Sequence, residues 1–164
     1  MNQIVAVCPG SFDPVTVGHL DIIKRAAGMF SKVIVVVMTN SSKHPCFTAD
    51  ERISMIRSVV SDIPNVEVDT YDGLLADYAK KVNAGAIVKG LRAMSDFEYE
   101  FQMALTNKKL NPYVETVFLT TQAENMYLSS SMVKEIASMG GDIKDFVPAE
   151  ILETILKRIQ TERK

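Results

Sequence analysis

The chain has 164 residues, of which 47% are hydrophobic and 23% are charged, a composition ordinary for one globular domain. Its formal net charge is −2, which argues against a general nucleic-acid-binding protein, since such proteins are usually visibly basic. No apolar run approaches the roughly 20 residues of a membrane-spanning helix and no signal peptide is evident, so we expect a cytoplasmic protein that binds neither nucleic acid nor membrane.

Short β-branched runs alternate along the chain with longer segments of helical pattern. The predicted strands are nearly continuous in apolar residues, as strands buried on both faces are: Gln3–Cys8, Lys32–Met38, Val66–Thr70, Ala86–Lys89 and Thr116–Thr120. The predicted helices are Gly18–Phe30, Ala49–Val60, Leu74–Asn83, Ser95–Leu110, Ser131–Ser138 and Pro148–Gln160. This alternation predicts a single α/β domain over residues 1–164, with a doubly wound five-stranded parallel sheet and C-terminal helices. Ligands of such sheets bind beyond the carboxyl ends of the strands, so the segments that follow the strands are the candidates for the site.

The first predicted strand leads into the segment PGSFDPVTVGH, residues 9–19. This segment lacks the lysine of a Walker A loop and the GxGxxG spacing of a dinucleotide-binding turn. Gly10 and Ser11 instead predict a turn whose backbone N–H groups approach an anion. His19 lies at the start of the next helix, where the helix dipole favours phosphate, and its ring can donate to a phosphoryl oxygen. Packing or capping of the helix would explain the same histidine.

Cationic residues follow the second and the fourth predicted strands. Lys43 lies in the polar loop TNSSKHPCF, where it could contact phosphate or could simply be solvated. Lys89 and Arg92 flank the end of the fourth strand, and an arginine can bind two phosphate oxygens at once. The third strand is followed instead by the apolar pair Leu74 and Leu75, which suits an uncharged part of a ligand.

The helix after the fourth strand has two distinct faces. Asp96, Glu100 and Asn107 share one face, where carboxylates could accept hydrogen bonds from ribose hydroxyls or could only be solvated. Phe97 and Phe101 lie on a neighbouring apolar face, which we assign to the core.

Three consecutive serines, Ser129 to Ser131, open the helix after the fifth strand. One of them is explained by capping alone, and three together suggest a second anion-binding turn. Tyr127 and Leu128, directly before them, could lie against a flat ring or could fill the loop.

Three segments, PGSFDPVTVGH, KGLRAMSDFEYEFQ and LSSSMVKE, resemble in order and spacing the bacterial phosphopantetheine adenylyltransferases. That family belongs to a nucleotidyltransferase superfamily of Rossmann-like fold with a T/H-x-G-H motif, here Thr16-Val17-Gly18-His19. The resemblance covers nearly the whole chain. It implies transfer of AMP from ATP to 4′-phosphopantetheine, giving dephospho-coenzyme A and pyrophosphate in coenzyme A biosynthesis.

The resemblance also implies roles for individual residues. His19 would stabilise the transition state, and Lys43 and Arg92 would be catalytic with it. The residues that would bind ATP are Ser11, Phe12, His19, Gly90, Leu91, Arg92, Glu100, Asn125, Met126, Tyr127, Leu128, Ser129, Ser130 and Ser131. The residues that would bind 4′-phosphopantetheine are Ser11, Lys43, Leu75, Lys89 and Asn107.

Two positions depart from the family pattern. The family often has arginine where this chain has Lys89, and lysine keeps the charge without the planar fork that binds two oxygens. Thr106 stands where a relative has methionine near the pantetheine arm. Neither departure removes a reacting group.

The implied reaction needs little acid–base chemistry from the protein. A phosphate monoester is already ionised near neutral pH, so positioning and charge stabilisation are the main requirements. We expect Mg²⁺ held mainly by substrate phosphates and water, with no metal-binding residues of the protein. The two histidines and the unclustered Cys8 and Cys46 argue against a structural zinc site. The resemblance further implies a homohexamer and feedback binding of coenzyme A.

Other functions fit parts of the pattern. An adenylyl- or cytidylyltransferase acting on nicotinate mononucleotide or glycerol 3-phosphate would share the fold, but the GLRA…DFEYE segment argues against it. A non-catalytic nucleotide sensor would bind ATP without turnover. A fragment of a class I aminoacyl-tRNA synthetase is disfavoured by the chain's length and charge.

Overall fold

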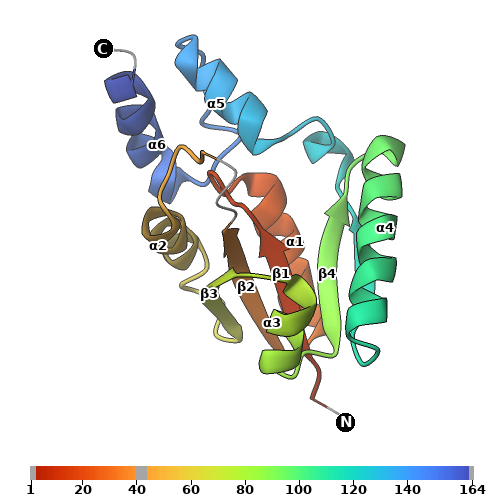
Figure 1. The fold of residues 1–164 in the computed structure, drawn as a ribbon. Helices are drawn as coiled ribbons and strands as arrows, with labels where there is room; N and C mark the ends of the chain where they lie inside the picture. Colours follow the sequence, from red (N-terminus) through yellow and green to blue (C-terminus); the bar gives the residue numbers. More distant parts are fainter. Residues whose placement is uncertain (1–2, 40–43, 163–164) are drawn as a thin grey trace.

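A computed structural model describes residues 3–39 and 44–162 of the chain and shows a five-stranded parallel sheet flanked by helices (Figure 1). The elements in chain order are β1 Val5–Gly10, α1 Val17–Met29, β2 Lys32–Thr39, α2 Ala49–Val59, β3 Val66–Asp72, α3 Leu75–Lys81, β4 Ala86–Leu91, α4 Met94–Leu110, β5 Glu115–Thr120, the 3-10 turn η1 Ala123–Asn125, α5 Ser130–Ser138 and α6 Ala149–Glu162. The predicted α/β fold with five parallel strands is confirmed.

The strand order is β3-β2-β1-β4-β5, so the direction of winding reverses between β1 and β4. From β1 the chain passes through α1 to β2 on one side, and from β3 it crosses over to β4 on the other side. The carboxyl ends of the strands point towards α5, which lies above the sheet in Figure 1. A crevice at this reversal is where ligands of open parallel sheets bind.

Side chains of the sheet alternate between two apolar layers. Cys8 and Val35 belong to the larger cluster, which includes residues of α1, α2, α5 and α6. Val7 and Val36 belong to a smaller cluster on the other face, packed against Tyr78 of α3. The central strands β1, β2 and β4 are therefore covered on both faces, as their apolar residues predict, whereas the edge strand β3 has no buried residue.

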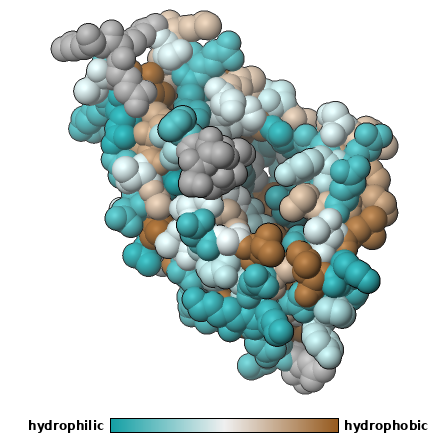
Figure 2. Space-filling view, viewed as in Figure 1, coloured by the Kyte–Doolittle hydropathy of each residue, from teal (hydrophilic) through white to brown (hydrophobic). Residues whose placement is uncertain are grey.

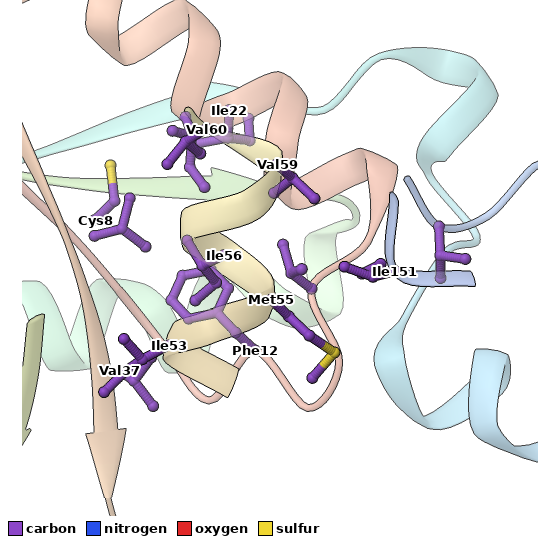
Figure 3. Close-up of a cluster of buried hydrophobic side chains, with 14 of the residues drawn as sticks. Cys8, Phe12, Ile22, Val37, Ile53, Met55, Ile56, Val59, Val60 and Ile151 are labelled. Atoms are coloured by element: carbon purple, nitrogen blue, oxygen red, sulfur yellow. The ribbon is translucent and has the colours of Figure 1, made fainter. Parts of the chain in front are cut away.

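Helix α2 begins at Ala49, as predicted, with a capping box at Thr48. The Thr48 side chain accepts a hydrogen bond from the Glu51 backbone N–H at 3.2 Å, and the Glu51 carboxylate accepts one from the Thr48 N–H at 2.8 Å. The helix directs Ile53 and Ile56 into the larger apolar cluster, which also contains Phe12 from the loop after β1 (Figure 3). This packing fixes the loop that leads into the site.

The observed bounds differ from the predicted ones by at most two residues. At the site, β1 ends at Gly10 rather than at Cys8 and β4 ends at Leu91 rather than at Lys89. Pro9 and Gly10 continue the ladder opposite Val36 and Val37. The loop that carries Ser11 therefore begins directly at the sheet edge.

Helix α4 corrects one prediction. Phe97 and Phe101 stack on each other with ring centroids 5.5 Å apart, yet 37% and 46% of their surfaces are exposed, so their assignment to the core is wrong. The structure describes every residue of α4, and Asn107 is the only one of them that is buried. A helical pattern shows that an apolar face exists, but it does not show which surface covers that face.

Across residues 3–39 and 44–162, no helix is long and apolar enough to cross a membrane.

Candidate active site

A cavity of about 280 Å³ lies at the carboxyl ends of β1 and β4, where the strand order reverses. The space-filling view shows the molecule hollowed beside α4 (Figure 2). Residues from three strand ends line the cavity: Cys8, Gly10, Phe12, Thr16, His19, Lys89, Gly90, Arg92, Asp96, Glu100, Thr121, Asn125, Leu128, Ser129 and Ser130.

His19 is held in the first turn of α1 by its own helix cap. Nδ1 of His19 accepts a hydrogen bond from the Thr16 backbone N–H at 3.0 Å, and the Thr16 side chain accepts one from the His19 N–H at 3.3 Å. Because Nδ1 accepts, the neutral ring carries its proton on Nε2. His19 therefore does cap the helix, as one of the two interpretations of the sequence predicts. The same ring lines the cavity, where its Nε2–H can donate a hydrogen bond.

The environment of His19 keeps the ring neutral. Burial is the main cause, and the positive charges of Arg92 and Lys89 act in the same direction, so that the pKa of His19 falls from 6.5 to about 4. At neutral pH the residue is consequently a neutral donor, which can stabilise developing negative charge without titrating.

The turn after β1 is shaped by Phe12 as well as by its small residues. Phe12 adopts a left-handed backbone conformation with φ of 48°, and its buried ring meets the edge of the His19 ring at a centroid distance of 5.0 Å. A Cβ at Gly10 would lie 3.0 Å from the Phe12 ring, so a larger residue there would displace it. Gly10 ends β1 rather than opening a turn with Ser11, so the position predicted for this turn is wrong, and close approach of the phenylalanine is one reason for the glycine.

The cations after β4 are held by carboxylates of α4. Nζ of Lys89 lies 3.3 Å from the Glu100 carboxylate, and Nε of Arg92 lies 3.3 Å from that of Asp96. Nη1 of Arg92 also donates to the Leu128 carbonyl at 2.8 Å, which connects the end of β4 to the loop before α5. Two cations of fixed position therefore stand beside the His19 donor, an arrangement that suits a polyphosphate.

The three serines at the start of α5 differ in what they contact. Ser129 caps the helix by accepting a hydrogen bond from the Met132 N–H at 3.1 Å, as predicted for one of the three. Ser130 donates to the Pro14 carbonyl at 2.7 Å and so connects α5 to the loop after β1. Ser131 is exposed and borders a second cavity.

Two further cavities adjoin the first. One of about 100 Å³ shares Lys89 and Glu100 with it and is otherwise lined by Leu75, Ile87, Tyr99, Met103, Ala104, Asn107 and Thr116. The other shares Phe12, His19 and Ser130 with it and includes Ser11 and Ser131. The first cavity, whose two cations are each paired with a carboxylate, thus continues into a smaller cavity of mixed polar and apolar lining.

Most of the residues predicted for the site line these three cavities. They are Ser11, Phe12, His19, Leu75, Lys89, Gly90, Arg92, Glu100, Asn107, Asn125, Leu128, Ser129, Ser130 and Ser131. Leu91, Met126 and Tyr127 line none of the three, and Tyr127 packs on Phe146 instead. Lys43 lies outside the described residues, and Thr106 is exposed on α4.

Four charged residues that the sequence patterns do not single out border the second cavity. They are Asp13, Arg52, Asp72 and Lys134, and the first two are buried. The sequence does carry a signal for Asp13, because it lies between Phe12 and Pro14 and a carboxylate in an apolar setting needs hydrogen-bond or ionic partners. The described residues contain no group of three or more His, Cys, Asp or Glu side chains that could hold a metal ion.

Sequence comparisons place the chain among nucleotidyltransferases. A family model described as cytidylyltransferase-like matches residues 7–136. The phosphopantetheine adenylyltransferase of Caldanaerobacter subterraneus subsp. tengcongensis is 61% identical over 156 residues, which cover 95% of this chain and 98% of that protein. The protein of the same name from Clostridium tetani is 58% identical over 154 residues, covering 94% and 96% respectively.

Comparison of structures gives the same fold. A solved structure from Vibrio parahaemolyticus, described as a nicotinate-nucleotide adenylyltransferase, superposes with a TM-score of 0.71 at 15% identity, covering 94% of this chain and 99% of that one. The nicotinic acid mononucleotide adenylyltransferase of Plasmodium falciparum superposes with a TM-score of 0.66 at 14% identity, covering 99% and 97%. At such low identity these likenesses show the fold alone.

Proposed function

The chain belongs to the phosphopantetheine adenylyltransferase family, and we propose that the cavity at the ends of β1 and β4 is where it transfers AMP from ATP to 4′-phosphopantetheine. The products are dephospho-coenzyme A and pyrophosphate. This is the enzyme activity, part of coenzyme A biosynthesis, that the sequence motifs predict. The nicotinate-mononucleotide alternative has only a likeness of fold in its favour, at 15% identity.

The position of His19 carries the proposal. Its Nδ1 accepts from the Thr16 N–H, which leaves an Nε2–H donor on a ring that lines the cavity with Lys89 and Arg92. In the reaction a phosphate oxygen of 4′-phosphopantetheine attacks the α-phosphorus of ATP, and the bond from that phosphorus to the departing pyrophosphate breaks. A neutral N–H donor and two cations stabilise the oxygens that gain charge.

The adjoining cavities suggest a place for each substrate. ATP fits the first cavity, with Arg92 and the serine-capped start of α5 near its phosphates. The pantetheine arm would enter the smaller cavity, where Leu75 and Asn107 offer apolar and polar contacts. Lys89 borders both cavities, so it is suited to the phosphate that joins the two substrates. Lys43 would act with these residues as a further donor, and coenzyme A, which contains both moieties, would bind the same two cavities.

We propose that Mg²⁺ enters with ATP and lowers the charge of the polyphosphate when bound. Asp96 and Glu100 line the cavity, and each is paired with a cation. Asp13 is paired with Lys134. These carboxylates therefore leave the metal to phosphate oxygens and water, which is a common arrangement for Mg²⁺.

The apolar side of α4, formed by Met94, Phe97, Phe101 and Leu105, supports the proposal of a homohexamer. All four side chains are at least 37% exposed, and Figure 2 shows apolar atoms along the α4 side of this face. A contiguous exposed apolar surface of this kind is typical of a protein interface. The cytoplasmic location stays a prediction from the sequence.

Pyrophosphate release separates this proposal from its alternatives. The folded chain is incubated with ATP and Mg²⁺ and, in parallel, with 4′-phosphopantetheine, nicotinate mononucleotide or glycerol 3-phosphate. We expect release with 4′-phosphopantetheine alone. Preference for another acceptor would identify a different transferase, and binding of ATP without release with any acceptor would identify a sensor.

A further inference from the structure

A buried carboxylate beside the cavity connects three segments that form its walls. Asp13, in the loop after β1, is 7% exposed. Its Oδ1 accepts a hydrogen bond from the Phe47 backbone N–H at 2.9 Å, and its Oδ2 accepts one from the Cys46 N–H at 3.0 Å. Nζ of Lys134, on α5, donates to the same Oδ2 at 2.8 Å. One carboxylate thus joins the loop after β1, the loop before α2 and helix α5.

The connection between Asp13 and Lys134 links two parts of the site. Asp13 precedes His19 in the same loop and helix start, while Lys134 lies one turn after Ser130, which borders the cavity. The hydrogen bond from Ser130 to the Pro14 carbonyl runs between the same two segments. The ion pair therefore helps to set the distance from His19 to the start of α5.

A further charged residue, on α2, holds the loop after β1 through hydrogen bonds to backbone carbonyls. Arg52 of α2 is 4% exposed, and its Nη1 donates to the Ser11 carbonyl at 2.8 Å. Its Nε donates to the Phe47 carbonyl at 3.0 Å. Arg52 thus holds the backbone at Ser11 and Phe47, while the Asp13–Lys134 pair and the Ser130 hydrogen bond connect the loop to α5.

Asp13 remains ionised where it lies. Burial alone would raise its pKa, but the hydrogen bond from Lys134 and those from Cys46 and Phe47 outweigh burial, and the pKa lies below its ordinary value of 3.8. The Lys134 and Asp13 side chains are 31% and 10% exposed. A partly buried ion pair of this kind holds the two segments that carry it in place more firmly than a fully exposed pair does.

We propose that Asp13 and Lys134 form a positioning pair for the transfer reaction, holding the start of α5 in register with His19. The inference rests on the proposed function. Lys134 acts on the rate through Asp13 rather than by contact with substrate. Misplacement of a substrate-holding group by about 1 Å can lower a rate about 100-fold, so the pair has its effect on kcat.

Three lysine variants test the proposal in the full chain, with turnover of ATP and 4′-phosphopantetheine as the readout. Lys134→Met removes the pair, Lys134→Arg keeps its charge, and Lys157→Met removes an exposed i,i+4 pair with Glu153 on α6 as a matched control. We expect Lys134→Met to lower kcat by about 10- to 100-fold, with a Kd for ATP within about threefold of wild type. Lys134→Arg should recover most of the rate, and Lys157→Met should behave as wild type.

A double-mutant cycle with Asp13→Asn identifies the route of the effect. If Lys134 acts through Asp13, Lys134→Met has little further effect on kcat in the Asp13→Asn background. The proposal is overturned if Lys134→Met leaves kcat within about threefold of wild type, or if its effect is unchanged when Asp13 is asparagine. A rise in the Kd for ATP that matches the loss of rate would also overturn it, by making Lys134 a direct ligand. Turnover by the wild-type chain, measured in the same series, tests the proposed function separately.

Discussion

The backbone N–H of Thr16 donates a hydrogen bond of 3.0 Å to Nδ1 of His19. Thr16 is the cap residue of α1 and His19 lies three residues later, so this hydrogen bond completes a capping box. The same bond fixes the tautomer of the His19 ring. His19 therefore stabilises the helix through one ring nitrogen and offers the other as a donor in the cavity. A substitution at this position removes both effects, and they have to be separated.

Two substitutions of His19 separate capping from catalysis. His19→Ala should lower the free energy of unfolding by about 1 kcal/mol through loss of the cap contact. His19→Gln should retain more of that stability, because glutamine at the third helical position can still accept from the cap N–H. In both variants we expect kcat to fall by about 100- to 1,000-fold, the usual effect of removing a donor to a developing oxyanion. Chemical unfolding and steady-state kinetics give the two quantities, and ATP titration gives the Kd.

The ATP titration decides what His19 does in the site. The Kd for ATP should change far less than kcat in both variants. Equal losses in kcat and in ATP affinity, with the fold intact, would show that His19 only binds ATP and would remove its role in the transition state.

The lowered pKa of His19 predicts a specific pH dependence of stability. The unfolded chain takes up this proton near pH 6.5 and the folded chain only near pH 4, so wild type should lose stability as the pH falls from 6.5 towards 4. His19→Gln lacks this difference, and its free energy of unfolding should decline less between pH 7.5 and pH 5. Urea unfolding at the two pH values measures both slopes. Equal slopes would mean that His19 titrates normally in the folded chain.

Much of the fold is predictable because its signals are local. Continuous β-branched runs indicate strands buried on both faces, and the Thr48 capping box marks the start of α2 to the residue. The parallel order then brings the ends of β1 and β4 together, so His19 and Arg92 can be assigned to one site without a structure.

The remainder depends on contacts between distant segments. Asp13 contacts Lys134 across 121 positions in the chain, and no local pattern pairs them. The sequence alone also cannot predict that Phe97 and Phe101 are exposed, since an apolar helical face has the same pattern whether its own chain or another chain covers it. Local sequence patterns therefore predict residues that line the cavity, whereas the contacts that hold those residues in place join distant segments.

Lys89 provides a test of where 4′-phosphopantetheine binds. It borders the two cavities proposed for the substrates and lies 3.3 Å from Glu100. Lys89→Met should raise the KM for 4′-phosphopantetheine by about tenfold or more, as expected for the loss of a charged hydrogen bond. Lys89→Arg should stay within about threefold of wild type, since it retains the charge. The matched control is Lys32→Met, which removes an ion pair with Glu67 at the opposite end of the strands. An unchanged KM in Lys89→Met would place the substrate phosphate elsewhere.

A single substitution that introduces a charge tests whether the chain assembles through the apolar side of α4. Phe101→Glu puts a carboxylate in the middle of that side, and we expect the proposed hexamer to separate into smaller species. Met29→Glu places the same charge on another exposed apolar residue, at the end of α1, and should leave the assembly intact. Light scattering coupled to size-exclusion chromatography measures the mass of each. A wild-type chain that is monomeric, or a Phe101→Glu hexamer, would contradict this assignment of the face.

Mass spectrometry of the reaction products tests the central claim most directly. The folded wild-type chain is incubated with ATP, Mg²⁺ and 4′-phosphopantetheine, and the quenched mixture is analysed over time for every nucleotide. Adenylyl transfer predicts dephospho-coenzyme A and pyrophosphate in equal amounts, with no free AMP. Pyrophosphate accompanied by AMP would show transfer to water instead, and the absence of both products from folded protein would contradict the account.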